Sequence, residues 1–238
     1  MISEILSELK NELPPTVKLV AVSKFHPFES IVQAYEAGQR IFAESRPQEL
    51  FAKEKQRIAL MGLRSDESGC GLEVSSREGY MSDLQWHFIG HLQTNKLKMV
   101  LPYVSLVQSV DSLRLLDAID RWGRENGRVT DILLECHISS DISKQGFSED
   151  EFPGVVHHCQ CLENVRVRGV MGMATLTDNV EIVRNDFRRL VSFGNLLRRL
   201  SGWDCPEISM GMSGDFRIAV EEGSTMVRIG SLIFGSRN

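Results

Sequence analysis

Short apolar runs alternate with amphipathic segments along almost the whole chain. Eight of these runs, rich in Val, Ile, Leu and Phe, have the length and composition of strands that are buried on both faces. We expect them at residues 17–24, 40–43, 86–90, 104–110, 131–137, 165–170, 207–210 and 226–229. Between them, apolar residues recur at three- and four-residue intervals, which is the pattern of a helix with one buried face. Helices are expected at residues 2–13, 29–37, 47–58, 96–101, 111–127, 178–200 and 213–222, and from Ser148 onward.

Eight strands alternating with helices predict an α/β protein with the (β/α)8 (TIM) barrel architecture and one extra N-terminal helix. An open, doubly wound sheet is the other arrangement of this class, but it usually begins with a glycine-rich first turn. The first turn here is Ser23 to Pro27, which contains no glycine. We therefore expect a single barrel domain over residues 1–238, with a flexible Gly- and Ser-containing insertion at about 62–82.

Composition places the chain among ordinary globular proteins. It has 238 residues, of which 42% are hydrophobic and 25% charged, and a net charge of -5. This charge gives no overall attraction to nucleic acid or to an anionic membrane, and no apolar run has the length of a membrane span. The N-terminus lacks the basic start and apolar core of a signal peptide, so the expected location is the cytoplasm.

Cysteine spacing indicates neither a disulfide framework nor a metal site. The five cysteines are odd in number and irregularly spaced. Cys159 and Cys161 follow His157 and His158, but this spacing does not match a closed zinc motif. We predict no metal.

Lys24 is the first residue with candidate chemistry, because it stands where the first buried strand emerges into a loop. A lysine in this place can form a Schiff base with an aldehyde, although lysines at strand ends are more often plain surface residues. The barrel changes this balance, because ligands of such barrels bind at the C-terminal ends of the strands. Several polar or unusual residues share that position with it: Glu44, Ser45, His91, Met173, Ser213 and Arg228.

Two late glycine-bearing loops indicate a phosphate site. In one, Ser213 is a natural N-cap, and the free amide groups of a helix start attract phosphate. In the other, Gly230 allows a close backbone approach and Ser231 adds a hydroxyl, while Arg228 points inward and needs an acceptor. The loops after strands seven and eight commonly bind phosphate in these barrels. A ligand with an aldehyde and a phosphate satisfies both features, and spacing alone leaves open whether it is pyridoxal 5'-phosphate (PLP) or a sugar phosphate.

Specific motifs over nearly the whole chain resemble the PLP homeostasis protein family, the single-domain relatives of the alanine racemase N-terminal barrel. They are residues 19–24 (LVAVSK), 86–96 (WHFIGHLQTNK), 168–174 (RGVMGMA), 209–213 (SMGMS), 227–231 (VRIGS) and 233–235 (IFG). The resemblance implies that Lys24 binds PLP covalently as a Schiff base, and that Arg228 faces its pyridine nitrogen. It also implies that Ser213, Gly230 and Ser231 hold the phosphate. Ser45 stands where the family has an asparagine, and it is included among the expected cofactor contacts.

The resemblance implies a non-catalytic PLP carrier or buffer in vitamin B6 homeostasis, which supplies cofactor to PLP-dependent apoenzymes. A fixed cation at the pyridine nitrogen disfavours its protonation and weakens the cofactor as an electron sink. Racemases on this barrel use a tyrosine from an additional domain as a second base, and the chain is expected to end after its eighth strand, without room for one. A monomer is expected. The alternative function is a PLP-dependent amino acid racemase of the alanine racemase type.

Three further polar residues are not expected to belong to the site. His87 lies within a strand and is expected to be a satisfied core residue, whereas His91 is expected at the edge of the mouth. Lys144 lies in a loop after the fifth strand, where solvated lysines are common.

Overall fold

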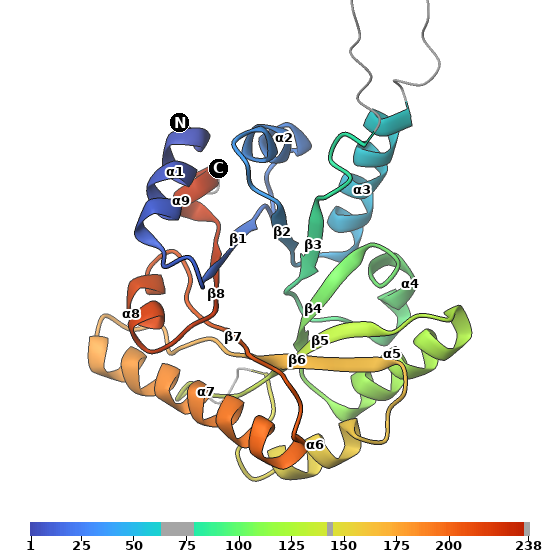
Figure 1. Ribbon diagram of the computed structural model, residues 1–238, viewed down its shortest axis with the longest axis vertical. Helices are drawn as coiled ribbons and strands as arrows, with labels where there is room; N and C mark the ends of the chain where they lie inside the picture. Colours follow the sequence, from blue (N-terminus) through green and yellow to red (C-terminus); the bar gives the residue numbers. More distant parts are fainter. Residues whose placement is uncertain (63–78, 142–144, 236–238) are drawn as a thin grey trace, which may run out of the picture.

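The computed structural model describes residues 1–62, 79–141 and 145–235, and its centre is a closed barrel of eight parallel strands (Figure 1). Each strand pairs with the next one in sequence, and the eighth pairs with the first, so the predicted (β/α)8 architecture is confirmed. The strands are β1 (Lys18–Val22), β2 (Ile41–Glu44), β3 (Gln85–Phe88), β4 (Val104–Val110), β5 (Thr130–Glu135), β6 (Val165–Met171), β7 (Glu207–Ser209) and β8 (Met226–Ile229).

Helices surround this barrel on its outside (Figure 1). They are α1 (Ile2–Glu12), α2 (Phe28–Glu36), α3 (Pro47–Gly62), the 3₁₀ turn η1 (Thr94–Lys96), α4 (Leu97–Val100), α5 (Leu113–Asn126), α6 (Phe152–Cys159), α7 (Val180–Ser201), α8 (Phe216–Glu221) and α9 (Ser231–Phe234). The expected extra helix before the first strand is α1, which packs against α2 and α9. It thereby brings the first and last helices of the described chain side by side.

Apolar side chains form two separate layers. The larger one fills the space between barrel and helices, and it includes Phe42 and Trp86 from the strands and Phe187 from α7. The smaller one fills the barrel interior, where Val20 and Leu133 are among the buried residues. Strands that are apolar on both faces satisfy both layers at once, which explains why their sequences read as continuous apolar runs.

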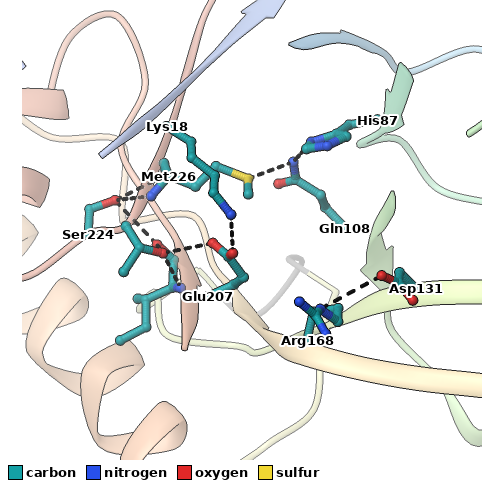
Figure 2. Close-up of polar contacts among 10 residues, drawn as sticks. Lys18, His87, Gln108, Asp131, Arg168, Glu207, Ser224 and Met226 are labelled. Atoms are coloured by element: carbon teal, nitrogen blue, oxygen red, sulfur yellow. Dashed lines mark hydrogen bonds and ion pairs between the residues drawn. The ribbon is translucent and has the colours of Figure 1, made fainter. Parts of the chain in front are cut away.

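Ion pairs lie at the amino-terminal end of the barrel interior (Figure 2). Lys18, the first residue of β1, pairs with Glu207, the first residue of β7. Arg168 of β6 lies 3.7 Å from a carboxylate oxygen of Asp131 in β5. Ligands of such barrels bind at the opposite end, where the strands finish.

Some predicted helix starts were wrong. The N-cap of α5 is Ser112 rather than Asp111, because the Ser112 hydroxyl accepts a hydrogen bond from the amide of Leu115. Helix α8 begins at Phe216, and not at Ser213. A hydrogen-bonded turn from 212 to 215 comes first, in which the side chain of Asp215 accepts from the amide of residue 212 at 2.6 Å. Ser148 and Glu151 exchange the hydrogen bonds of the predicted capping box, but Ser148 does not cap α6, because the helix begins at Phe152 with Glu151 as its N-cap.

The predicted insertion at 62–82 lies mostly outside the described residues, together with Cys70. Its described end forms turns, in which the amide of Ser82 donates to the carbonyl of Gly79 at 2.9 Å. Met81 is buried there, so this end belongs to the core. Within the described ranges, none of the helices is both long enough and apolar enough to cross a membrane.

Candidate functional site

The turn that carries Lys24 lies beside the loop after β8. Lys24 is half-buried and follows the last residue of β1 by two positions. Since β8 pairs with β1, Gly230 comes next to this turn, and a Cβ atom at Gly230 would lie 3.0 Å from the carbonyl oxygen of Val22. The rings of His26 and Phe234 are also in contact, with centroids 5.2 Å apart. Glycine at position 230 therefore permits the close approach of the two segments.

The loop after β7 completes this group of neighbours. Ser213 is half-buried in the turn before α8, and β7 pairs with β8. Ser231 is exposed at the start of α9, where the first amide groups of the helix have no carbonyl partner within it. The loops after β7, β8 and β1 are consecutive around the barrel, so the structure brings the segments of Ser213, Ser231 and Lys24 to one side of the mouth.

Arg228 is buried inside the barrel and reaches from β8 toward the ends of two other strands. It is 4% exposed, and its guanidinium donates to the hydroxyl of Ser209 at 2.7 Å and to the carbonyl of Gly172 at 3.0 Å. Burial lowers the pKa of Arg228 to about 10, against the opposing effect of Glu135 and Asp215. The side chain therefore remains a cation at neutral pH, and the predicted inward orientation is confirmed.

A chain of buried hydrogen bonds continues from Arg228 across the barrel, and Figure 2 shows its last step, from Gln108 to His87. The hydroxyl of Ser209 donates to Oε1 of Gln108 at 2.7 Å, and Nε2 of Gln108 lies 2.8 Å from Nδ1 of His87. A guanidinium can only donate, so Ser209 accepts from Arg228 and its own hydroxyl proton goes to Oε1 of Gln108. The amide nitrogen of Gln108 then donates to His87, which accepts at Nδ1. Burial lowers the pKa of His87 to about 3, which keeps the imidazole neutral as this direction requires. The predicted role of His87 as a satisfied core residue is confirmed.

Acidic groups occupy the opposite side of the mouth. Glu135, the last residue of β5, is 5% exposed. Burial, together with the neighbouring carboxylate of Asp111, raises the pKa of Glu135 to about 7, against the opposing effect of Arg228 and His91. His91 is half-exposed and lies 3.1 Å from Asp111. Glu135 is therefore a buried carboxyl that can change its charge near neutral pH.

We expect Glu135→Gln to stabilise the ligand-free protein at pH 8 and to have little effect at pH 4. The pKa of Glu135 is raised from 4.5 to about 7, because the folded protein favours the protonated carboxyl. The stability that this carboxyl contributes is fully present below pH 4.5 and is lost as the pH rises through about 7. The amide avoids this loss, which amounts to about 3 kcal/mol in the free energy of unfolding. Urea unfolding at both pH values measures it, with the exposed Glu125→Gln as control. Equal gains at the two pH values would contradict the expectation.

Ser45 and the remaining candidates are distributed around the rim. Ser45 is half-buried after β2, and its carbonyl group lies against Gly90, which follows β3. Its contact with a cofactor stays a prediction. Lys144 lies outside the described residues. His158 pairs with Asp117 at 2.7 Å, and no group of three or more potential metal ligands occurs in the described part of the chain.

Similar proteins were found in sequence and in structure. The family described as "Alanine racemase, N-terminal domain" matches residues 2–238. The pyridoxal phosphate homeostasis protein of Aquifex aeolicus is 36% identical over 92% of this chain and 87% of its own length. That of Haemophilus influenzae is 34% identical over 96% of this chain and 89% of its own.

The solved structures of PipY from Synechococcus elongatus, one without PLP and one with PLP bound, also resemble this fold. They superpose with TM-scores of 0.86 and 0.85, are 33% identical in sequence, and the matches cover 99% of this chain and 100% of PipY. The family match extends over residues 2–238, and the identity to the Aquifex aeolicus relative extends over 92% of the chain. The chain therefore belongs to the alanine racemase N-terminal domain family and, within it, to the pyridoxal phosphate homeostasis proteins.

Proposed function

We propose that this protein is a cytoplasmic, monomeric carrier or buffer of PLP, which takes part in PLP homeostasis by supplying the cofactor to PLP-dependent apoenzymes. The observation that carries the proposal is the arrangement at the mouth, where the Lys24 turn and the Gly230 loop are in contact beside the buried Arg228. An amine, a phosphate-accepting loop and a buried cation match the aldehyde, the phosphate and the pyridine nitrogen of PLP. The relatives named as PLP homeostasis proteins, and PipY with PLP bound, support this assignment.

Each group has a distinct role in this proposal. Lys24 holds PLP covalently as a Schiff base, and Arg228 faces the pyridine nitrogen. When bound, PLP supplies an electron sink, and a fixed cation at its nitrogen weakens that property. The phosphate is held by the loops after β7 and β8, and Ser45 lies at the rim. The residues assigned to these last two roles are Ser213, Gly230, Ser231 and Ser45.

The tyrosines favour a carrier over an amino acid racemase, which needs a second base opposite the lysine. Tyr35 donates to Asp83 from the end of α2, and Tyr80 donates to Glu36 at 3.2 Å. Tyr103 precedes β4, at the amino-terminal end of the barrel. All three tyrosines of the chain are thus away from the mouth, and this supports a role without robust catalysis.

Adding PLP to the purified protein is expected to produce an imine absorption band that Lys24→Ala loses completely. The substitution removes the only atom through which that residue can bond to the aldehyde. Absorption spectroscopy measures the band, and Lys55→Ala, at an exposed lysine of α3, is the matched control and should retain it.

Two results would contradict the proposal. A wild-type protein that shows no imine band with excess PLP would exclude the Schiff base on Lys24. Interconversion of L- and D-alanine at enzyme-like rates would replace the carrier role by racemase activity. Size-exclusion chromatography with light scattering tests the monomer in the same preparations.

A further inference from the structure

The backbone on both sides of Lys24 is held by side chains from other elements. The carbonyl of Ser23 accepts from Nζ of Lys53 at 2.8 Å, and the amide of Phe25 donates to Oε1 of Glu49 at 2.6 Å. Lys53 and Glu49 lie four residues apart on α3, so consecutive turns of one helix hold the peptide groups before and after Lys24. These contacts leave Lys24 on a turn whose two flanking peptides are fixed from outside.

Lys53 is the centre of this network. Its ammonium donates to Ser23, to Glu44 at 2.6 Å and to Glu49 at 2.9 Å, which uses all three of its protons. The side chain is only 6% exposed, although a lysine on a barrel helix normally points to solvent. A fully bonded ammonium at this depth has a defined position, so it can fix the groups around it.

Glu44 links the network to the barrel itself. It is the last residue of β2, is completely buried, and accepts at Oε1 from both Lys53 and the hydroxyl of Ser23, the latter at 2.6 Å. Its other oxygen, Oε2, is buried without a hydrogen-bond partner among the described residues. Burial raises the pKa of Glu44 to about 6, which the Lys53 ammonium opposes. A buried ion pair with an unsatisfied oxygen stabilises a fold poorly, so stability alone does not account for it.

The turn itself has a conformation that needs such support. Phe25 has a φ of +68°, in the left-handed region that a residue with a Cβ atom rarely adopts. Its ring packs under the guanidinium of Arg46, 4.4 Å from the ring centroid. Residues in this region persist when surrounding contacts determine them, and here the contact is the bond from the Phe25 amide to Glu49.

We propose that Lys53, together with Glu44 and Glu49, is a positioning residue that fixes the turn of Lys24 and so directs its amine toward the aldehyde of a bound PLP. The network acts on the backbone around Lys24 and makes no bond to the cofactor. This inference rests on the proposed function, and it adds a requirement for covalent attachment that is separate from phosphate recognition.

The test compares Lys53→Met with Lys55→Met, which changes an exposed lysine on the same helix. In the ligand-free protein, hydrogen exchange of the segment 23–26 is expected to accelerate in Lys53→Met and not in the control. The rate at which PLP forms the imine band should fall about tenfold or more, because a small misplacement of a reacting group has a large effect on rate. Affinity for pyridoxine 5'-phosphate, which has the phosphate and ring but no aldehyde, should stay unchanged.

Glu49→Ala provides a second variant. Glu49 is partly exposed, so its removal should lower the free energy of unfolding less than the removal of Lys53 does. It should change hydrogen exchange and imine formation in the same direction, and it decides the question if Lys53→Met does not fold. Exchange and imine rates equal to those of Lys55→Met would overturn the inference, as would equal losses for PLP and pyridoxine 5'-phosphate. A wild type that binds PLP without an imine would instead contradict the proposed function. Hydrogen exchange of the segment 23–26 would still measure whether the network fixes the backbone of the turn.

Discussion

The Gly90→Ala variant is expected to lose at least about 4 kcal/mol of its free energy of unfolding. A Cβ atom at this position would lie 2.0 Å from the carbonyl oxygen of Ser45 and within 2.8 Å of two other backbone atoms of that residue. Backbone atoms cannot rotate away as a side chain can, so the ends of β2 and β3 must separate. The segment with Ser45 would then move, and the rim of the site would move with it.

The matched control is Gly154→Ala in α6, where an added Cβ atom meets nothing within 4 Å. Alanine has the higher helix propensity, so this variant should gain about 0.5–1 kcal/mol. Chemical unfolding of both variants and of the wild type measures the difference. Gly90→Ala with a wild-type midpoint would show that the β2 and β3 ends do not approach each other as closely as described.

The sequence predicted the barrel well because strands that are buried on both faces appear in it as short continuous apolar runs. In the apolar run 19–22, for example, Leu19 and Ala21 belong to the outer layer and Val20 and Val22 to the barrel interior. The order of such runs then fixes a closed parallel barrel, which places Lys24 and Arg228 at one mouth. Element ends were less predictable, since Ser112 and Asp111 are both good N-caps and only the local hydrogen bond decides between them.

The parts of the site that were missed depend on contacts between distant residues. Lys53 has the sequence context of a solvent-facing helix residue, and only the position of α3 over the Lys24 turn buries it. Gln108 and Ser209 left a weaker signal, as polar residues within otherwise apolar strands. Such residues need partners when buried, but the sequence does not say which strand across the barrel provides them.

Gln108 joins the two halves of the buried chain that supports Arg228. Its Oε1 accepts from Ser209. Its Nε2 faces Nδ1 of His87 and the sulfur of Met226, the latter at 3.2 Å (Figure 2). Gln108 is completely buried, so water does not replace it easily. Without the amide, the hydroxyl of Ser209 loses its acceptor and the imidazole of His87 loses its donor.

Gln108→Leu is therefore expected to lose about 4 kcal/mol of its free energy of unfolding, since each polar group left buried without a partner costs about 1–3 kcal/mol. Ser105→Ala is the control on the same strand, because Ser105 is exposed and its single bond to the carbonyl of Trp86 is replaceable by water. It should lose less than about 0.5 kcal/mol. If Gln108→Leu proves as stable as this control, the hydrogen-bonded chain does not hold Ser209 in place. If it is destabilised as expected, binding of PLP should also weaken, because Arg228 depends on Ser209 for its orientation toward the mouth.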